Sequence, residues 1–200
     1  MDSLKDSVFQ RRSIRKYKDQ PVSKETITEL IRYAVAAPSA KNRQPWKFLV
    51  FEGDAKAGLL DAMEMGLNFI LNAPDIPEGA KAGMNSAMNT LRIMRDAPVV
   101  ICVLNTNGAS PFNQVDLFGR ITEICDTLSI GGAIQNLLLK ATEMGLGSLW
   151  IANTFFAHDA MTAYIGTEYQ LASAIALGYA DEDPVMRPRK DFEELIEFRK

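Results

Sequence analysis

A long apolar segment over residues 121–144 constrains the fold of this chain more than any other feature. Its apolar residues recur at helical spacing, but they cover more than one stripe of the helix. A helix that is apolar on nearly all sides must be buried on most of them. In a chain of only 200 residues, one way to bury such a helix is to pack it against a second subunit. Gly145 follows the segment and is suited to cap its C-terminus.

The remaining elements are shorter, and helices and strands follow one another without a regular βαβ alternation. Helical spacing and capping residues predict helices over residues 4–10, 24–37, 56–65, 84–95 and 158–164. Apolar runs predict strands over residues 47–52, 98–104, 149–152 and 171–179. The strand over 98–104 is apolar on both faces, which is typical of a central strand. Glycine and proline mark residues 66–83 and 105–113 as loops. This mixed order favours an α+β fold, with a single domain over residues 1–200.

Charge and composition exclude several classes of protein. The formal net charge is −3, whereas nucleic-acid binding depends on a positive surface, so nucleic acid is not an expected partner. No apolar run reaches the roughly 20 residues that are needed to cross a bilayer. The first 15 residues lack the apolar stretch of a secretory signal, so we expect a cytoplasmic protein with no membrane partner. Cys102 and Cys125 are expected to be buried free thiols.

Common catalytic and cofactor motifs are absent from the sequence. It contains neither the GxGxxG fingerprint of dinucleotide-binding folds nor the GxxxxGK[ST] phosphate loop. His158 is the only histidine and the cysteines lack ligand spacing, so neither a metal site nor a His-containing catalytic triad is supported. A surface or helix-capping position is favoured for His158 over a role as a general base. A chain that lacks obvious catalytic side chains but has anion-binding features indicates chemistry carried by a cofactor.

The anion-binding features are two basic clusters near the ends of the chain. The first follows the first predicted helix and contains Arg11, Arg12, Ser13 and Arg15. The second lies in the tail and contains Arg187 and Arg189. Guanidinium groups bind phosphate oxygens with two parallel hydrogen bonds, and a serine hydroxyl adds a donor. Two solvated basic turns would give the same composition, so convergence on one phosphate is a hypothesis at this point.

A third feature is the polar segment over residues 38–46, directly before the first predicted strand. Its prolines stiffen the backbone, while the side chains of Ser39, Asn42 and Gln44 can both donate and accept hydrogen bonds. A flat heteroaromatic ring with an imide edge requires such a mixed set. The alternative is a polar loop that is anchored in the core by Trp46, and the residues alone leave both open.

These motifs together resemble the nitroreductase family of FMN enzymes. The resemblance rests on Arg-Arg-Ser-Ile-Arg at 11–15, Pro-Ser-Ala-Lys-Asn-Arg-Gln-Pro-Trp at 38–46, and Ile-Gln-Asn-Leu-Leu-Leu at 134–139. It extends to Gly-Leu-Gly-Ser-Leu-Trp at 145–150, Ala-Leu-Gly-Tyr at 176–179 and the basic tail. Each motif is weak by itself, but together they span nearly the whole chain in the right order.

The resemblance implies an α+β fold with a mixed, mainly antiparallel sheet flanked by helices, in an intertwined homodimer that holds FMN at the subunit interface. The implied phosphate ligands are Arg11, Arg12, Ser13 and Arg15, joined by Arg187 or Arg189. The residues implied to approach the flavin from the partner subunit are Pro38, Ser39 and Asn42, with Gln44 close by. The backbone implied to lie near flavin N5 belongs to Ile151, Ala152 and Asn153. No catalytic side chain and no metal ligand is implied.

The implied activity is hydride transfer from NAD(P)H through bound FMN to nitroaromatic, quinone or similar electron-poor acceptors, by a ping-pong mechanism. The sequence departs from the family at Ser129, where many relatives carry an acidic residue, and at Ala152-Asn153. The helix residue that contacts flavin in the family is not evident near residues 89–92. Two alternatives remain open: a dehalogenating or flavin-fragmenting enzyme on the same fold, with residues 66–83 or 105–113 as a lid, and an FMN-binding protein without turnover.

Overall fold

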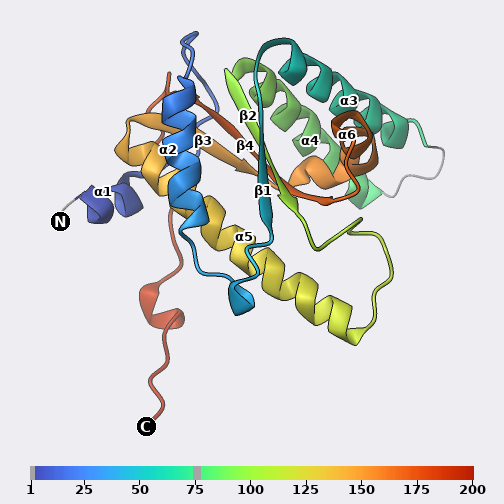
Figure 1. Cartoon of the computed structure of the whole chain (residues 1–200). Coiled ribbons are helices and arrows are strands. Elements are labelled where there is room, and N and C mark those ends of the chain that lie inside the picture. The colour runs from blue at the N-terminus through green and yellow to red at the C-terminus, as the bar shows by residue number, and fades with distance from the viewer. Residues whose placement is uncertain (1–2, 74–77) are drawn as a thin grey trace.

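The computed structural model describes residues 3–73 and 78–200, and its centre is a four-stranded sheet (Figure 1). The strands are β1 (Trp46–Phe51), β2 (Val99–Asn105), β3 (Leu146–Ile151) and β4 (Gln170–Tyr179), in the order β1-β2-β4-β3. All three strand pairs are antiparallel, and Ser13 and Ser148 form an isolated parallel bridge. Every residue of β2 is buried, which confirms the predicted central strand. The α+β class is therefore confirmed.

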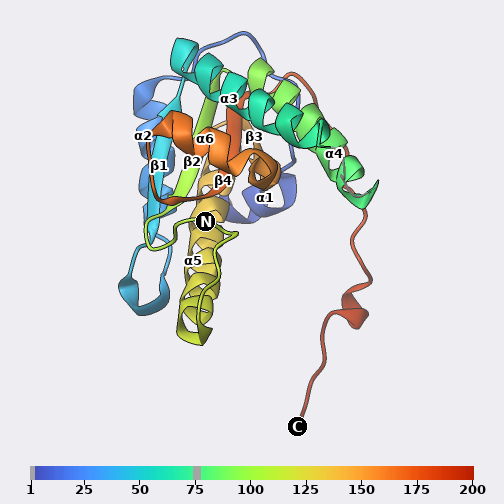
Figure 2. The same cartoon turned by 90° about the vertical axis from the view of Figure 1, so that its right-hand side faces the viewer.

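Helices cover both faces of the sheet, and the two faces have separate apolar cores. On one face lie α2 (Lys24–Val35) and α5 (Leu117–Glu143), and on the other lie α3 (Gly53–Leu71), α4 (Glu78–Asp96) and α6 (His158–Ile165) (Figures 1 and 2). Successive residues of β2 alternate between the cores: Ile101 contacts the α2–α5 side and Cys102 the α3–α4 side. Shorter elements are α1 (Ser3–Gln10) and the 3₁₀ turns η1 (Ala40–Asn42), η2 (Asn153–Ala157) and η3 (Phe192–Glu194).

Local chemistry explains most of the helix ends. The Ser23 hydroxyl accepts a hydrogen bond from the Thr26 N–H and caps α2, which ends at Val35, before Pro38. Gly145, with a φ of 75°, directly follows the C-cap of α5, as predicted. The strand predicted over residues 149–152 begins earlier, at Leu146, because residues 146–151 pair with β4 along their whole length.

The prediction of a loop over residues 66–83 is wrong. Helix α3 continues to Leu71, and α4 begins at Glu78. Between them, residues 72–73 are non-helical, and residues 74–77 lie outside the described residues. The glycines at the two ends of the predicted loop, Gly66 and Gly83, allow close packing of helices. A Cβ on Gly66 would lie 3.0 Å from the Cβ atoms of Ala157 and Ala160, and a Cβ on Gly83 would lie 2.7 Å from the ring of Phe156.

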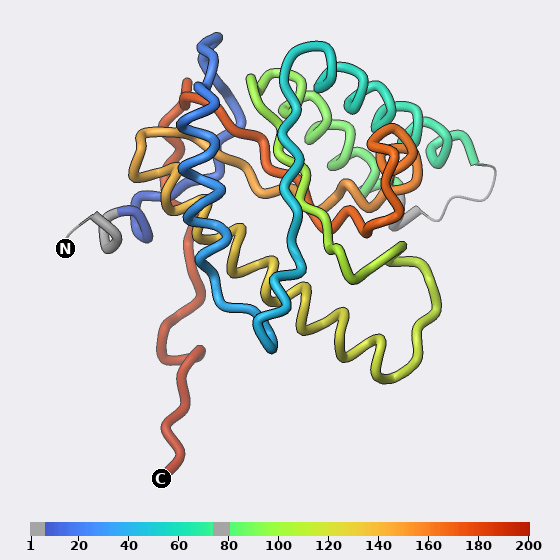
Figure 3. The backbone as a smooth tube through the Cα atoms, in the orientation of Figure 1, coloured from blue at the N-terminus to red at the C-terminus, as the bar shows by residue number. Residues whose placement is uncertain are grey.

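Helix α5 is buried along one half and exposed along the other. Its C-terminal half packs beneath α2 in the core of that face. Its N-terminal half projects past the sheet (Figure 1). One side of this half exposes a row of large apolar residues: Leu117, Phe118, Ile121, Ile124 and Leu128. The last residues of the chain extend away from the body (Figure 3). The C-terminal segment also exposes apolar side chains: Val185, Phe192, Leu195 and Phe198. Exposed apolar surface of this extent marks a site of interaction.

Among the described residues, no helix has both the length and the apolar character that a membrane span requires.

Candidate functional site

The two basic clusters, nearly 180 residues apart in sequence, meet at one pocket. This pocket has a volume of about 200 Å³, and we call it the basic pocket. All six residues that the sequence suggested for phosphate binding line it together with three apolar residues: Arg11, Arg12, Ser13, Arg15, Arg187 and Arg189, with Pro184, Val185 and Met186. The two clusters are therefore not separate in space, which favours convergence on one anion over two independent basic turns.

Backbone pairing brings the clusters together. The tail leaves β4 and runs beside residues 15–18, with hydrogen bonds from the Lys18 N–H to the Tyr179 carbonyl and from the Asp181 N–H to the Lys16 carbonyl. The Arg15 N–H donates to the carboxylate of Glu182. These bonds align the tail with the segment after α1, so that the second basic cluster follows the first into the same pocket.

Among the described residues, no carboxylate forms an ion pair with the five guanidinium groups of the basic pocket. Arg12 and Arg15 instead donate to backbone carbonyls, at 2.6 Å to Phe9 and 2.9 Å to Ser13. Burial, followed by the neighbouring charges of Arg189 and Arg12, lowers the pKa of Arg11 below its ordinary value. An arrangement of this kind is stabilised by a bound anion.

Strand β3 is an edge strand and positions the basic pocket. The Ile14 N–H donates to the Ser148 carbonyl at 3.0 Å, which lays the segment after α1 across β3. This crossing requires Gly147, because a Cβ there would lie 2.8–2.9 Å from Cγ2 and Cβ of Ile14. The Tyr17 hydroxyl donates to the Ile14 carbonyl at 2.8 Å, and burial raises the pKa of Tyr17 well above its ordinary value. The pocket is thus anchored to a strand.

The predicted N5 segment lies at the far end of the same strand. Ile151, about 10 Å from Ser148 at the usual rise of a strand, ends β3. Ala152 and Asn153 then lead into η2. The Asn153 amide nitrogen donates to Thr90 Oγ1 at 3.0 Å. Asn153 Oδ1 and Ser148 Oγ are buried and have no hydrogen-bond partner among the described residues. Buried polar atoms without partners are rare, so both are suited to a ligand along this edge.

The contact with Thr90 places α4, the helix predicted over residues 84–95, beside the N5 segment, a position that the sequence did not reveal. Thr90 lies on α4, and one residue earlier Asn89 accepts a hydrogen bond from Arg92 at 2.7 Å. Residues 89–92 therefore lie beside the N5 segment, although no motif in the sequence pointed to them. The amphipathic spacing of α4 was the available signal, but spacing does not reveal which neighbour a polar face will meet.

The predicted ring-contacting residues lie elsewhere. Pro38, Ser39, Asn42 and Gln44 belong to a loop around η1, which we call the 38–45 loop, and Figure 2 shows this loop and the C-terminal tail on opposite sides of α5. One chain therefore does not bring these residues to its own basic pocket. This separation is the arrangement that a contribution from a partner subunit would require.

The backbone of the 38–45 loop is unusual. Lys41, Asn42 and Gln44 have φ values of 55°, 54° and 49°, in the left-handed region that residues other than glycine rarely adopt. The Ala40 N–H donates to Ser129 Oγ at 3.2 Å, and Arg43 donates to buried Asp126 on α5. This hydrogen bond raises the pKa of the Arg43 guanidinium above its ordinary value. Asn42 and Gln44 have exposed side chains.

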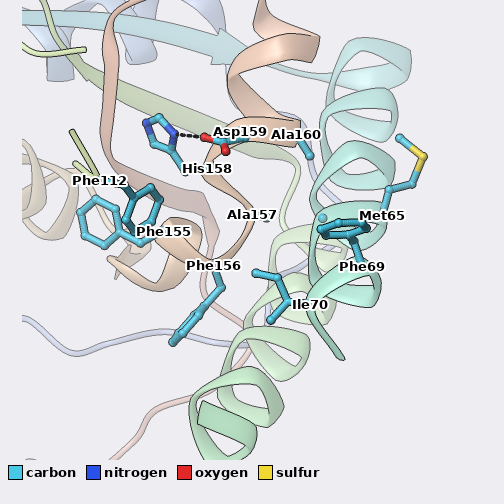
Figure 4. Close-up of a pocket in the computed structure, with 11 residues that line it drawn as sticks. Met65, Phe69, Ile70, Phe112, Phe155, Phe156, Ala157, His158, Asp159 and Ala160 are labelled. Carbon is cyan, nitrogen blue, oxygen red and sulfur yellow. Dashed lines mark hydrogen bonds and ion pairs between the residues drawn. The ribbon is translucent and has the colours of Figure 1, made fainter. Parts of the chain in front are cut away.

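An aromatic cavity of about 460 Å³ lies next to η2 (Figure 4). Met65 and Phe69 of α3 form one side, and Phe112 and Phe155 form the other. His158 lies at its edge and is not a surface residue, because its side chain is only 5% exposed. Its Nδ1 lies 2.9 Å from Asp159 Oδ1, while Nε2 is buried without a partner among the described residues. The cavity suits a flat apolar molecule.

The thiols are free, as predicted, but only one is fully buried. Cys102 lies in the core on β2, whereas Cys125 is half-buried on α5. Burial raises the pKa of the Cys102 thiol to about 12. Neither thiol lines the basic pocket or the aromatic cavity.

Comparison with known proteins relates this geometry to a family. A family model described as the nitroreductase family matches residues 8–179. The chain is 26% identical over 189 residues to YfhC of Bacillus subtilis, named as an NAD(P)H nitroreductase, covering 93% of this chain and 89% of that protein. It is 30% identical over 152 residues to 5,6-dimethylbenzimidazole synthase of Rhodospirillum rubrum, covering 74% and 68%. A BluB-like flavoprotein from Clostridium difficile has 29% identity and a TM-score of 0.78, covering 98% of this chain and 99% of that one.

Proposed function

Because this chain belongs to the nitroreductase family, we propose that it is an FMN-dependent oxidoreductase that passes hydride from NAD(P)H to nitroaromatic, quinone or similar electron-poor acceptors. One observation carries the proposal: two basic clusters from opposite ends of the chain converge on one pocket, and no carboxylate of the described residues forms an ion pair with their guanidinium groups. The similarity to YfhC and to the BluB-like flavoprotein supports NAD(P)H and a flavin, respectively.

The residues of the basic pocket and of β3 fit FMN. A pocket of about 200 Å³ with five guanidinium groups and a serine hydroxyl suits one phosphate group. The edge strand then leads from this pocket to Asn153, whose Oδ1 has no partner in the described part of the chain. When bound, FMN would supply the two-electron chemistry, accepting hydride from NAD(P)H and releasing it to an acceptor in a separate step. The protein binds, orients and shields the reactants.

We assign the remaining contacts to a second subunit. The 38–45 loop points away from the basic pocket of its own chain (Figure 2). The exposed apolar side of α5 and the exposed tail supply surfaces that a homodimer would bury. A two-fold dimer would use each of these surfaces twice, and would place the loop of one chain beside the pocket of the other.

The aromatic cavity is the proposed entry point for the acceptor. It adjoins η2, which begins at Asn153, so a molecule there would lie next to the proposed flavin site. Its lining of Phe69, Phe112 and Phe155 favours flat apolar acceptors through ring stacking. A cavity with few polar groups selects by shape, so a broad acceptor range is expected.

Absorption spectroscopy tests the proposal directly. The purified protein, alone or after addition of FMN, is expected to show two visible flavin bands, which bleach when NAD(P)H is added without oxygen. Bands that return when a nitroaromatic or quinone is added would establish turnover. A colourless protein that takes up no FMN would contradict the cofactor, and a bound flavin that NAD(P)H does not bleach would favour a binding protein without turnover.

A second candidate is a flavin-fragmenting reaction, which is favoured by the similarity to 5,6-dimethylbenzimidazole synthase. The compound in that enzyme's name, 5,6-dimethylbenzimidazole, carries a dimethyl-substituted benzene ring, as the flavin does. Aerobic incubation of the protein with FMN and excess NAD(P)H separates the two reactions. Permanent loss of the flavin absorbance, without reduction of added acceptors, would support fragmentation. Full recovery of the absorbance once NAD(P)H is exhausted would support the oxidoreductase.

A further inference from the structure

The 38–45 loop is held by an ion pair between Arg43 and Asp126. The Arg43 Nε and Nη2 atoms lie 3.0 and 2.6 Å from the same oxygen, Oδ1 of Asp126. The second oxygen, Oδ2, accepts a hydrogen bond from the Asn107 side chain at 3.1 Å. The Asp126 side chain is only 1% exposed, whereas that of Arg43 is 27% exposed. Both carboxylate oxygens are therefore used, and a buried negative charge depends on Arg43 for its partner.

This pair holds the strained part of the loop. Arg43 has an ordinary helical conformation, with a φ of −70°, but it lies between Asn42 and Gln44, which are both left-handed. Left-handed residues other than glycine persist only where their surroundings enforce them. A tether at the central residue restrains the backbone on both sides of it, while the side chains of Asn42 and Gln44 remain exposed.

The anchor lies on the helix that would meet the partner. Asp126 and Ser129 are buried on the side of α5 that faces the loop, and Ser129 Oγ accepts from the Ala40 N–H. Another side of the same helix exposes Ile124 and Leu128. The loop is thus fixed to the helix that carries the proposed dimer surface, and its position relative to a partner subunit is set through α5.

We infer that the Arg43–Asp126 pair is a positioning device for flavin binding: it fixes the 38–45 loop so that its exposed polar side chains meet the flavin of the partner subunit. Neither residue is expected to contact the flavin itself. The identity of the ligand, FMN, rests on the proposed function. The restraint that the ion pair places on the loop does not depend on that function. The Asp61–Arg95 pair is a suitable control, because both of its side chains are well exposed.

The restraint is tested first without flavin. Amide hydrogen exchange of the apoprotein is expected to be at least tenfold faster over residues 40–45 in R43Q and D126N than in the wild type, with β1 unchanged. D61N is expected to leave the loop unchanged. Equal exchange in the wild type and R43Q would overturn the inference. If a single variant does not fold, the double variant R43Q/D126N decides, because it leaves neither charge of the pair without its partner.

FMN titration tests the consequence. R43Q and D126N are each expected to weaken FMN binding at least tenfold and to change the visible circular dichroism of the bound flavin, with an unchanged dimer. The double variant R43Q/D126N is expected to bind FMN at least as tightly as the single variant with the lower affinity, because the two residues act as a unit. Wild-type affinity and dichroism in R43Q would overturn the inference. Absence of FMN binding by the wild type would instead refute the proposed function, and the exchange result would stand.

Discussion

The basic pocket and the 38–45 loop differ in whether a carboxylate pairs with their guanidinium groups. In the basic pocket, five arginines converge, and within the described part of the chain no carboxylate forms an ion pair with them. In the loop, the guanidinium of Arg43 is neutralised by Asp126 of the same chain, and the neighbouring polar side chains are exposed. The first region is prepared for an anion, and the second is a shaped surface whose own charge is satisfied. One chain therefore carries two regions of different character on opposite sides of α5 (Figure 2), which are the two halves of the proposed site.

The largest expected effect comes from removing charge from the basic pocket. The double variant Arg11→Ala/Arg15→Ala is expected to weaken FMN binding by roughly 100-fold or more, because it removes two charge-assisted hydrogen bonds to phosphate. Titration of the apoprotein with FMN measures the effect. The control Arg32→Ala/Arg199→Ala removes two well-exposed arginines and should bind normally. A double variant that purifies fully yellow would refute the phosphate assignment.

Mixing variants tests whether the two halves come from different subunits. Arg11→Ala/Arg15→Ala damages the pocket, and Ser39→Ala/Asn42→Ala damages the loop. In a mixed two-fold dimer, one site combines both damaged halves and the other combines both intact halves. Random exchange in an equal mixture gives half mixed dimers, so about a quarter of all sites should regain tight FMN binding.

The matched control for this experiment is each variant mixed with itself, which should recover nothing. Flavin content after subunit exchange, measured by absorbance per protein chain, gives the result. No recovery in the mixed sample, although exchange is demonstrated by differently tagged chains, would mean that pocket and loop serve the same chain.

A smaller effect is expected from Gly147→Ala. The added Cβ would overlap Ile14 and displace the segment that carries the basic pocket. Overpacking of this kind costs about 1–3 kcal/mol, so the melting temperature should fall by roughly 2–10 °C, with FMN binding about tenfold weaker. Thermal unfolding and titration measure these changes. Gly132→Ala, where the nearest atom lies 4.0 Å away, is the control and should leave FMN binding unchanged.

The smallest effect concerns the pH dependence of stability and involves neither half of the site. Burial raises the pKa of Cys102 to about 12, above the value of about 8.5 in an unfolded chain. Its contribution to stability is therefore fully present below about pH 8.5 and is lost as the pH rises toward 12. Urea unfolding should show the stability difference between wild type and Cys102→Ala shrinking by about 2 kcal/mol from pH 8 to 10.5. Parallel pH curves would contradict this.

Prediction from sequence worked best where the signal was local. The central strand over residues 99–105 followed from an apolar run, and the start of α2 followed from the Ser23 cap. It was wrong at residues 66–83, because prolines and glycines such as Gly83 were interpreted as marks of a loop. The structure uses Gly83, and likewise Gly66, as spacers between packed helices. A glycine that makes room for a neighbour cannot be distinguished from a glycine in a turn until the neighbour is known.

The candidate site shows the same difference between local chemistry, which can be predicted from sequence, and long-range packing, which cannot. The side chains that could hold a phosphate were evident from the sequence, because the chemistry of arginine and serine does not depend on the fold. The three-dimensional arrangement was needed to show that residues 11–15 and 187–189 share one pocket, that Asn153 meets α4, and that Arg43 is neutralised by Asp126. The physical reason is that charge and hydrogen-bonding capacity belong to a residue, whereas burial and pairing depend on residues far away in the chain.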